Sequence, residues 1–207
     1  MFVNYLDKLK RGPQVILPKD AGMIIAFAGI NRESVVLNAG AGSGWLDVQI
    51  GRIAKKVVSY EVRQEFLDLA QSNIRRVGLE NVQIKLRDVI ANGFEEKDAD
   101  VVVLDFANSH LAIANAIGSL KTGGVIVGYL PHAEQMSAFV QELEKNGFAD
   151  NFCMEANVRQ MLVRAAGVRP ASMGITHTAY LVFARKGEKQ LDKRERKKAR
   201  HTKINAF

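Results

Sequence analysis

Three acidic residues that follow strand-like stretches are the side chains best placed for chemistry in this sequence. Glu61 and Asp105 each end an apolar run, and Asp88 ends a stretch in which apolar and polar residues alternate. Because the carboxyl ends of parallel strands meet at one edge of a sheet, we expect the three carboxylates to share a ligand crevice. A carboxylate accepts hydrogen bonds, so Glu61 suits the two hydroxyls of a ribose and Asp88 suits an adenine amino group. The alternatives are that Glu61 only begins a solvated helix and that Asp88 only caps a turn.

A glycine-rich turn precedes these acids. An apolar run that begins at Val35 leads into three alternating glycines and then into an amphipathic segment over 46–54: the glycines are Gly40, Gly42 and Gly44. Glycines at a strand-to-helix turn let a ligand touch the backbone, and the helix that follows directs free N–H groups at the same place. A dinucleotide fingerprint would need a glycine where Trp45 stands. The pattern instead resembles motif I of class I S-adenosylmethionine (SAM) methyltransferases, although such a turn can also simply end a strand.

The order of apolar runs, glycine stops and helical periodicity predicts five strand–helix units followed by two late strands. The expected strands begin at Val35 and then cover 57–61, 82–88, 100–105, 123–131, 151–163 and 176–185; the expected helices cover 46–54, 63–77, 111–120 and 133–145. Right-handed crossovers turn this order into a Rossmann-like, doubly wound α/β sheet of seven strands, the last one antiparallel.

Two prolines, Pro13 and Pro18, bracket an apolar triplet ahead of the first strand. Proline is incompatible with a regular helix there, so we expect an extended stretch leading into a helix capped by Asp20. The segment 11–30 would then lie across the ligand site as a lid, or act only as a surface connector.

Size and charge predict one domain, 1–186, and a basic tail, 187–207. The 207 residues carry a net charge of +7, and the stretch from Lys186 onward contains nine basic and three acidic residues. Such a tail is either solvated and flexible or in contact with phosphates. With no apolar run of membrane-spanning length and no signal peptide, we expect a cytoplasmic protein. Cys153 is the single cysteine and the histidines show no ligand spacing, so no metal is expected.

Several separated blocks together resemble the tRNA adenine-N1 methyltransferases that modify position 58 of the T-loop, and position 57 in archaea. The resemblance runs from Arg11 to about Lys186. Its blocks are 11–16 with 18–20, 59–61 with Arg63, 104–105, Tyr129 with Pro131 and Gln135, Glu155 with Arg159, 169–170, and 177–178 with 180–181. It implies SAM as cofactor, S-adenosylhomocysteine (SAH) as its product, tRNA as partner, no membrane association, and a homo-oligomer, usually a tetramer.

Carried over by position, the resemblance implies that Asp105 is the catalytic carboxylate. The implied cofactor contacts are Gln14, Asn38, Gly40, Gly42, Ser43, Gly44, Trp45, Leu46, Glu61, Asp88 and Asp105. The implied substrate contacts, each with a packing role as an equal alternative, are Tyr129, Gln135, Arg159 and His177.

Four departures from the family pattern bear on target choice. Asn38 stands where an acid is usual, Met161 replaces a tryptophan, and the residues after Asp105 lack the usual proline and tryptophan. Only about ten residues precede Arg11, so we expect the family's N-terminal β-rich domain to be missing. The alternatives are a SAM methyltransferase of a small molecule such as a precorrin, or of another RNA, and a non-catalytic tRNA-binding subunit.

Overall fold

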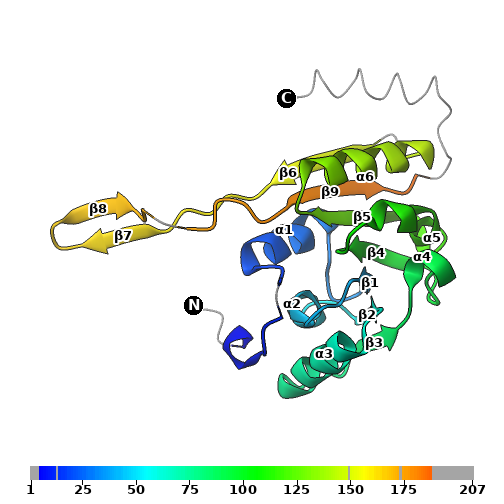
Figure 1. Ribbon diagram of the computed structural model, residues 1–207, viewed down its shortest axis with the longest axis horizontal. Helices are drawn as coiled ribbons and strands as arrows, with labels where there is room; N and C mark the ends of the chain where they lie inside the picture. The colour runs from blue at the N-terminus through cyan, green and yellow to red at the C-terminus, as the bar shows by residue number, and fades with distance from the viewer. Residues whose placement is uncertain (1–4, 13, 149, 173, 188–207) are drawn as a thin grey trace.

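The computed structural model describes residues 5–12, 14–148, 150–172 and 174–187, and a seven-stranded sheet forms its centre (Figure 1). In chain order the strands of this sheet are β1 (Val35–Ala39), β2 (Lys56–Glu61), β3 (Val82–Leu86), β4 (Ala99–Leu104), β5 (Leu120–Leu130), β6 (Asn151–Glu155) and β9 (Tyr180–Arg185). Their spatial order is β3-β2-β1-β4-β5-β9-β6. The first five run parallel, and β9 is antiparallel to both β5 and β6. The predicted doubly wound sheet with an antiparallel last strand is confirmed.

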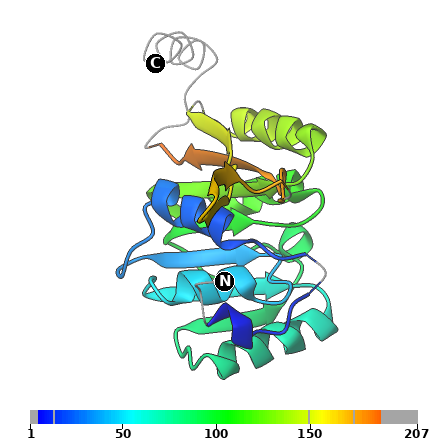
Figure 2. The same ribbon diagram turned by 90° about the vertical axis from the view of Figure 1, so that its left-hand side faces the viewer.

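Helices cover both faces of the sheet, as the buried strand residues require. They are η1 (Leu6–Lys8), α1 (Pro18–Ala28), α2 (Trp45–Gly51), α3 (Gln64–Arg76), α4 (Val89–Asn92), η2 (Ser109–Ala112), α5 (Ile113–Ile117) and α6 (Ala133–Lys145). Ile24 of α1 and Ile50 of α2 pack with Val103 on one face, and Ile113 of α5 and Phe139 of α6 pack with Leu104 on the other. Figure 2 shows α6 and β6 at one end of the stack of strands and α3 at the opposite end. Within the described ranges, none of the helices combines the length and apolar character needed to cross a membrane.

The register of the strands brings three predicted site residues to one edge of the sheet. Ala39 at the end of β1 lies beside Tyr60 of β2 and Leu104 of β4. The next residue on each strand path is therefore Gly40, Glu61 or Asp105. Parallel strands that end in register thus place the glycine turn and two carboxylates side by side.

Two expectations about helices were wrong. Asp20 does not cap α1: the helix begins at Pro18 with Leu17 as its N-cap, because proline suits the first helical position. The expected helix over 111–120 is instead a 3₁₀ turn followed by the short α5, and β5 already begins at Leu120.

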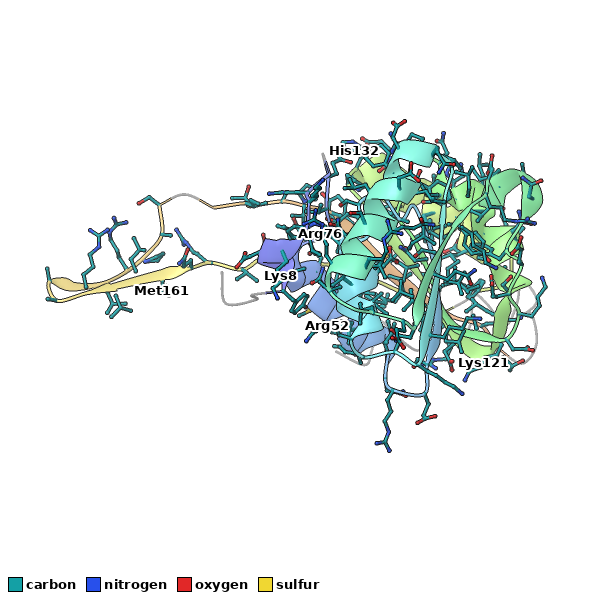
Figure 3. All side chains as sticks on the ribbon, turned by 90° about the horizontal axis from the view of Figure 1, so that it is seen from below. Lys8, Arg52, Arg76, Lys121, His132 and Met161 are labelled. Carbon is teal, nitrogen blue, oxygen red and sulfur yellow. The ribbon has the colours of Figure 1, made fainter. Side chains whose placement is uncertain are left out.

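The late region differs most from expectation. The strand expected over 151–163 ends at Glu155, and the chain then forms a separate hairpin of β7 (Met161–Arg164) and β8 (Gly167–Pro170). These two strands pair with each other and not with the main sheet. The hairpin and the described parts of its two connections, 157–172 and 174–178, project from the body as an arm (Figure 1), and the labelled Met161 lies far from the remaining labelled side chains (Figure 3).

Candidate active site

A cavity of about 760 Å³ opens at the carboxyl ends of the central parallel strands. It lies where ligands bind in doubly wound sheets. Nine of the predicted site residues line it: Gln14, Gly40, Gly42, Ser43, Glu61, Asp88, Asp105, Tyr129 and Gln135. Asn38, Gly44, Trp45, Leu46, Arg159 and His177 are not among its lining residues.

The glycine turn is a backbone cradle with room for a ligand. Gly40, Gly42 and Gly44 all have positive φ angles, of 87°, 54° and 75°. A Cβ atom at Gly40 would lie 1.9 Å from the backbone oxygen of Asp105, so only glycine lets the turn pass this loop. A Cβ atom at Gly42 would meet nothing within 4 Å, and Gly42 lines the cavity. The backbone here is bare on the side where a cofactor would lie.

Glu61 is fixed beside this cradle by backbone donors. Its Oε2 accepts a hydrogen bond from Gly42 N at 2.9 Å, and its Oε1 accepts from Val62 N and Arg63 N at 3.0 and 3.1 Å. The Arg63 guanidinium lies 3.7 Å from Oε1 and stacks on Phe66 at 3.9 Å. These contacts hold the carboxylate rigidly in the cavity wall and leave acceptor capacity for a ribose hydroxyl. The residues of the cradle therefore fit an adenosine-containing cofactor.

Asp88 both caps a helix and lines the cavity. Its Oδ1 accepts hydrogen bonds from Ile90 N at 2.8 Å and Ala91 N at 3.3 Å, which makes it the N-cap of α4. The capping role considered from the sequence is therefore present. Because the cap uses only Oδ1, it orients the side chain at the cavity wall and leaves Oδ2 available for a ligand.

Asp105 is a half-buried carboxylate surrounded by other acids. Its backbone N–H donates to Ala39 O at 2.8 Å, which locks the tip of β4 to the tip of β1. Removal from water, with smaller contributions from Asp47 and Glu61, raises the pKa of Asp105 to about 7. A carboxylic acid that titrates near neutrality and lines a cavity is a candidate for proton or hydrogen-bond chemistry.

Behind the glycine turn lies a buried polar cluster that sequence reasoning did not anticipate. The Asn38 side chain donates from Nδ2 to Asp47 Oδ1 at 2.9 Å, and the Ser59 hydroxyl donates to the same oxygen. All three residues are buried. Burial is the main cause that raises the pKa of Asp47 to about 6. Asn38 therefore lies beneath the cradle rather than in the cavity lining. Asp47 places an acid next to Asn38, where the family pattern has an acid at position 38 itself.

The segment before α1 is fastened to the wall of this site. Lys10 exchanges hydrogen bonds with the Asn73 side chain at 2.9 and 2.8 Å, and its carbonyl accepts from Trp45 Nε1 at 3.3 Å. Gln49 Nε2 donates to Ile16 O at 3.1 Å. The segment runs close to Ser43, and Gln14 lines the cavity. Trp45 thus helps to hold this segment in place, and Leu46 packs in the core with Ile50.

Tyr129 lies at the opposite wall within a second polar network. Asp20, fully buried on α1, accepts hydrogen bonds from Lys19 Nζ at 2.7 Å and from the Thr178 hydroxyl at 2.8 Å. Tyr129 hydrogen-bonds to Asp20 and Thr178, and burial followed by the charges of Asp20 and Asp105 raises its pKa. The phenol therefore remains neutral and links the cavity wall to the root of the arm through Thr178.

Gln135 lines the cavity, whereas His177 contacts the lining residue Pro131 from outside. Gln135 completes a capping box on α6 by accepting from His132 N at 3.3 Å. His177 Nδ1 lies 2.6 Å from Glu155 Oε1, and its Nε2 lies 2.9 Å from Pro131 O. Since both partners are acceptors, both ring nitrogens must donate. The hydrogen bond to Glu155 is the main cause that raises the pKa of His177.

Arg159 is exposed at the start of the arm, away from the cavity lining. The apolar lining residues that were missed include Val62, Ile90 and Phe106. Val62 is 61% exposed although apolar, and Ile90 is 37% exposed. Each follows one of the predicted acids by one or two positions, which is the signal that sequence reasoning left unused. In the part of the chain that the structure describes, no three His, Cys, Asp or Glu side chains are grouped as metal ligands; the expected absence of a metal stays a prediction.

Comparison with known proteins assigns this chain to a family. The family model described as "tRNA methyltransferase complex GCD14 subunit" matches residues 6–205. The tRNA (adenine(57)-N(1)/adenine(58)-N(1))-methyltransferase TrmI of Methanocaldococcus jannaschii is 36% identical over 225 aligned residues, covering 94% of this chain and 79% of that protein.

Two solved structures share both fold and sequence. A SAM-dependent O-methyltransferase from Thermotoga maritima has a TM-score of 0.86 at 30% identity, covering 93% of this chain and 73% of the other. The tRNA methyltransferase TrmI of Aquifex aeolicus has a TM-score of 0.83 at 28% identity, covering 89% and 75%. With a family model that matches nearly its whole length, and with a cradle and carboxylates that fit SAM, this chain belongs to the tRNA methyltransferase complex GCD14 subunit family.

Proposed function

We propose that this protein is a SAM-dependent methyltransferase that methylates N1 of an adenine in tRNA, at T-loop position 57 or 58. The observation that carries the proposal is the junction of Gly42, Glu61 and Asp105. A cofactor cradle and a carboxylate that titrates near neutrality line one cavity at adjacent strand ends. The relative from M. jannaschii is named for this reaction.

The cavity wall divides into contacts for the parts of SAM. Glu61 would accept hydrogen bonds from the ribose hydroxyls, and Asp88 would accept from the adenine amino group. The side chains of Val62 and Ile90, both in the lining, would offer apolar surface to the adenine. Gly42 leaves the backbone open to the cofactor. When bound, SAM supplies an activated methyl group on a positively charged sulfur, so the protein needs mainly to position the acceptor.

Asp105 acts on the target adenine. The lone pair of N1 lies on the Watson–Crick edge of the base, so the adenine must leave its stack before transfer. The ionised Asp105 carboxylate accepts a hydrogen bond from the N6 amino group, orients N1, and offsets the positive charge that develops on the ring. A positive charge bound in the cavity would favour this ionised form, because the carboxylates of Glu61 and Asp47 already lie close enough to Asp105 to raise its pKa.

Tyr129 and Gln135 line the same cavity and shape the space for the base. Arg159 and His177 lie outside the cavity lining, in the arm, where their positive charges suit the RNA strand that flanks the flipped adenine. The exposed position of Arg159 and the doubly donating His177 support this assignment.

The arm is proposed to assemble the protein into a homo-oligomer, in which a second copy covers the hairpin. Val158, Met161, Val163 and Val168 of the arm are all exposed apolar residues. A two-stranded hairpin on its own is marginally stable in water, and its unpaired edges need cover. The tetramer implied by the family resemblance provides that cover.

The function is tested by incubating the purified protein with methyl-labelled SAM and unmodified bulk tRNA, followed by nucleoside analysis. We expect labelled 1-methyladenosine with the native protein and none with Asp105→Asn, which keeps the shape of the side chain. Labelled tRNA with a different modified nucleoside would contradict the N1 assignment. SAM binding without any RNA methylation would favour a small-molecule methyltransferase, and no SAM binding would favour a non-catalytic subunit.

A further inference from the structure

Three carboxylates surround the glycine turn, although the reaction proposed above uses only two of them. Glu61 is bonded to Gly42 N on one side of the turn, and Asp105 is bonded through its backbone to Ala39 O on the other. Asp47, on the third residue of α2, lies beneath the turn and holds Asn38, the residue before Ala39. The third carboxylate, Asp47, has no assigned role.

The Asp47 carboxylate is incompletely compensated. Asp47 is fully buried, and both hydrogen bonds found for it go to Oδ1, from Asn38 and Ser59. No donor within the described residues reaches Asp47 Oδ2 or Asn38 Oδ1. A buried charge with an unsatisfied oxygen is costly unless something else compensates it. That cost points to a positive charge that arrives from outside the chain.

The remaining groups around the three carboxylates do not supply that charge to Asp47. Arg63 lies 3.7 Å from Glu61, and Arg87 lines the cavity but already bonds to Glu95 and to the Gly93 and Asn92 carbonyls. Asp88, His132, Tyr60 and the neutral Tyr129 complete the titratable lining. Asp47 interacts unfavourably with Glu61, and Asp105 does so with both, which helps to raise the pKa values of Asp47 and Asp105. Within the described residues the Asp47 carboxylate therefore has hydrogen-bond donors but no cationic partner.

We propose that Asp47, together with Glu61 and Asp105, forms an anionic cage that selects the cationic cofactor SAM over its neutral product SAH. This inference rests on the proposed function. The two molecules differ by one methyl group and by the positive charge on sulfur. Contacts to the adenosine that both contain therefore cannot make the protein bind one more tightly than the other. A cage of incompletely compensated carboxylates binds the sulfonium form more tightly, and the cage loses that advantage once the methyl group has left. Asp47 is thus a specificity-determining residue that acts through charge and does not touch the substrate.

Proton release accompanies this selection. Below about pH 7 part of the cage is protonated in the free protein. SAM binding favours the ionised carboxylates, and the displaced proton passes to solvent. SAH brings no charge on sulfur and displaces none. Affinity for SAM should therefore increase as the pH rises from about 5.5 to 8, while affinity for SAH changes little.

The test measures the dissociation constants of SAM and SAH by calorimetry at pH 5.5 and pH 8. Proton release is read at pH 6.5 in two buffers of different ionisation enthalpy. Asp47→Asn should lower the ratio of SAM to SAH affinity at pH 8 by about three- to tenfold, the range expected for one charge several ångströms away. It should also flatten the pH dependence of that ratio. Asp68→Asn, which removes an exposed negative charge on α3, is the matched control and should change neither.

A charge swap separates electrostatics from structure. In the double variant Asn38→Asp with Asp47→Asn, one carboxylate and one amide still face each other across the same hydrogen bond, so the SAM preference should return. Equal losses of SAM and SAH affinity in Asp47→Asn would overturn the proposal. Identical pH dependence and identical proton release for the two molecules in the native protein would overturn it too, without recourse to any variant. Failure of the native protein to bind either molecule would instead refute the proposed function.

Discussion

Asp105 shows how position alone converts an ordinary carboxylic acid into one that titrates near neutrality. Its neighbours Asp47 and Glu61 are also acids, and all three crowd the strand ends around the glycine turn. Sequence reasoning found Asp105 and Glu61 because each ends an apolar run. It did not find Asp47, because an acid on the first turn of an amphipathic segment looks like a helix-start residue on the surface. Only the packing of α2 against β1 and β2 buries it.

The stability of the free protein should depend on pH through this cluster. The folded pKa of Asp105 is about 7 and that of Asp47 about 6, both above the ordinary value of 3.8. Between pH 4 and 7 the folded state therefore holds more protons than the unfolded state, so the free energy of unfolding falls as the pH rises. A carboxyl whose folded pKa lies one pH unit above its unfolded pKa changes that free energy by about 1.4 kcal/mol.

Urea unfolding of the native protein, Asp47→Asn and Asp105→Asn at pH 5 and pH 7 checks this expectation. Both variants should lose less stability than the native protein over this interval, since the substituted group no longer titrates. An unchanged pH dependence in both variants would show that the two carboxyls titrate normally.

Glu61 should contribute directly to cofactor affinity. Glu61→Gln preserves size but replaces one acceptor oxygen with a donor, which faces either Gly42 N or the backbone donors Val62 N and Arg63 N. We expect SAM binding to weaken by roughly 1–3 kcal/mol, the typical cost of losing hydrogen bonds to a charged group. Calorimetric titration with SAM measures the loss, and unchanged affinity would place the ribose elsewhere. The thermal unfolding midpoint without ligand serves as the control for local disruption.

At the scale of elements, the glycine turn depends on two glycines for different reasons. Gly40 must be glycine because a Cβ atom would overlap the Asp105 carbonyl at 1.9 Å, whereas Gly42 has open space around its Cα. Both residues have positive φ angles, so alanine is strained at either position. The sequence pattern indicated that the turn needs glycines. It did not indicate which glycine lies against the loop after β4.

Gly40→Ala should therefore destabilise the protein more than Gly42→Ala. Both variants incur the backbone strain, but only the first must displace the loop that carries Asp105. Denaturant unfolding compares the two, with SAM affinity measured in parallel. Gly42→Ala should mainly reduce SAM affinity, because its new methyl group projects toward the cavity. Equal destabilisation of the two variants would contradict the close approach of the turn to Asp105.

The arm is the element that sequence reasoning could least describe. The residues 151–163 have the composition of one continuous strand, yet the edge strand β6 stops at Glu155. Beyond that point the described chain does not pair with the main sheet again until β9, and 161–164 pair instead with 167–170. Local pattern cannot distinguish a strand that stays in the sheet from one that leaves it, because both alternate in the same way.

If the arm mediates assembly, charge on its apolar side chains should disrupt the oligomer. Met161→Asp with Val163→Asp places two carboxylates on exposed side chains of β7 and should shift the protein toward smaller species. Multi-angle light scattering at micromolar concentration measures the mass. The matched control, Gln160→Glu with Arg164→Gln, changes the charge of the arm without altering its apolar side chains. A native protein that is already a monomer would contradict the assembly.

At the scale of the whole molecule, the body carries the site and the tail carries most of the net charge. Residues 188–207 lie outside the described part of the structure, so the tail remains a prediction from sequence. It contains eight basic and three acidic residues, and the block 193–198 places five basic residues around the single acid Glu195. By contrast, Lys186 belongs to the body, since its Nζ donates to Ile117 O at 2.8 Å. The natural point of truncation is therefore after Gly187.

We expect the tail to supply phosphate contacts to tRNA. Each phosphate that a lysine or arginine neutralises releases counterions, so tRNA affinity should fall with salt by about one unit of log–log slope per contact. Removal of 188–207 should flatten that slope and raise the dissociation constant for tRNA while leaving SAM affinity unchanged. A full-length variant with Lys197, Lys198 and Arg200 changed to glutamine keeps the tail length and should flatten the slope partly. Fluorescence anisotropy over a salt series measures both variants, and a slope that survives truncation would assign the phosphate contacts to the body and the arm.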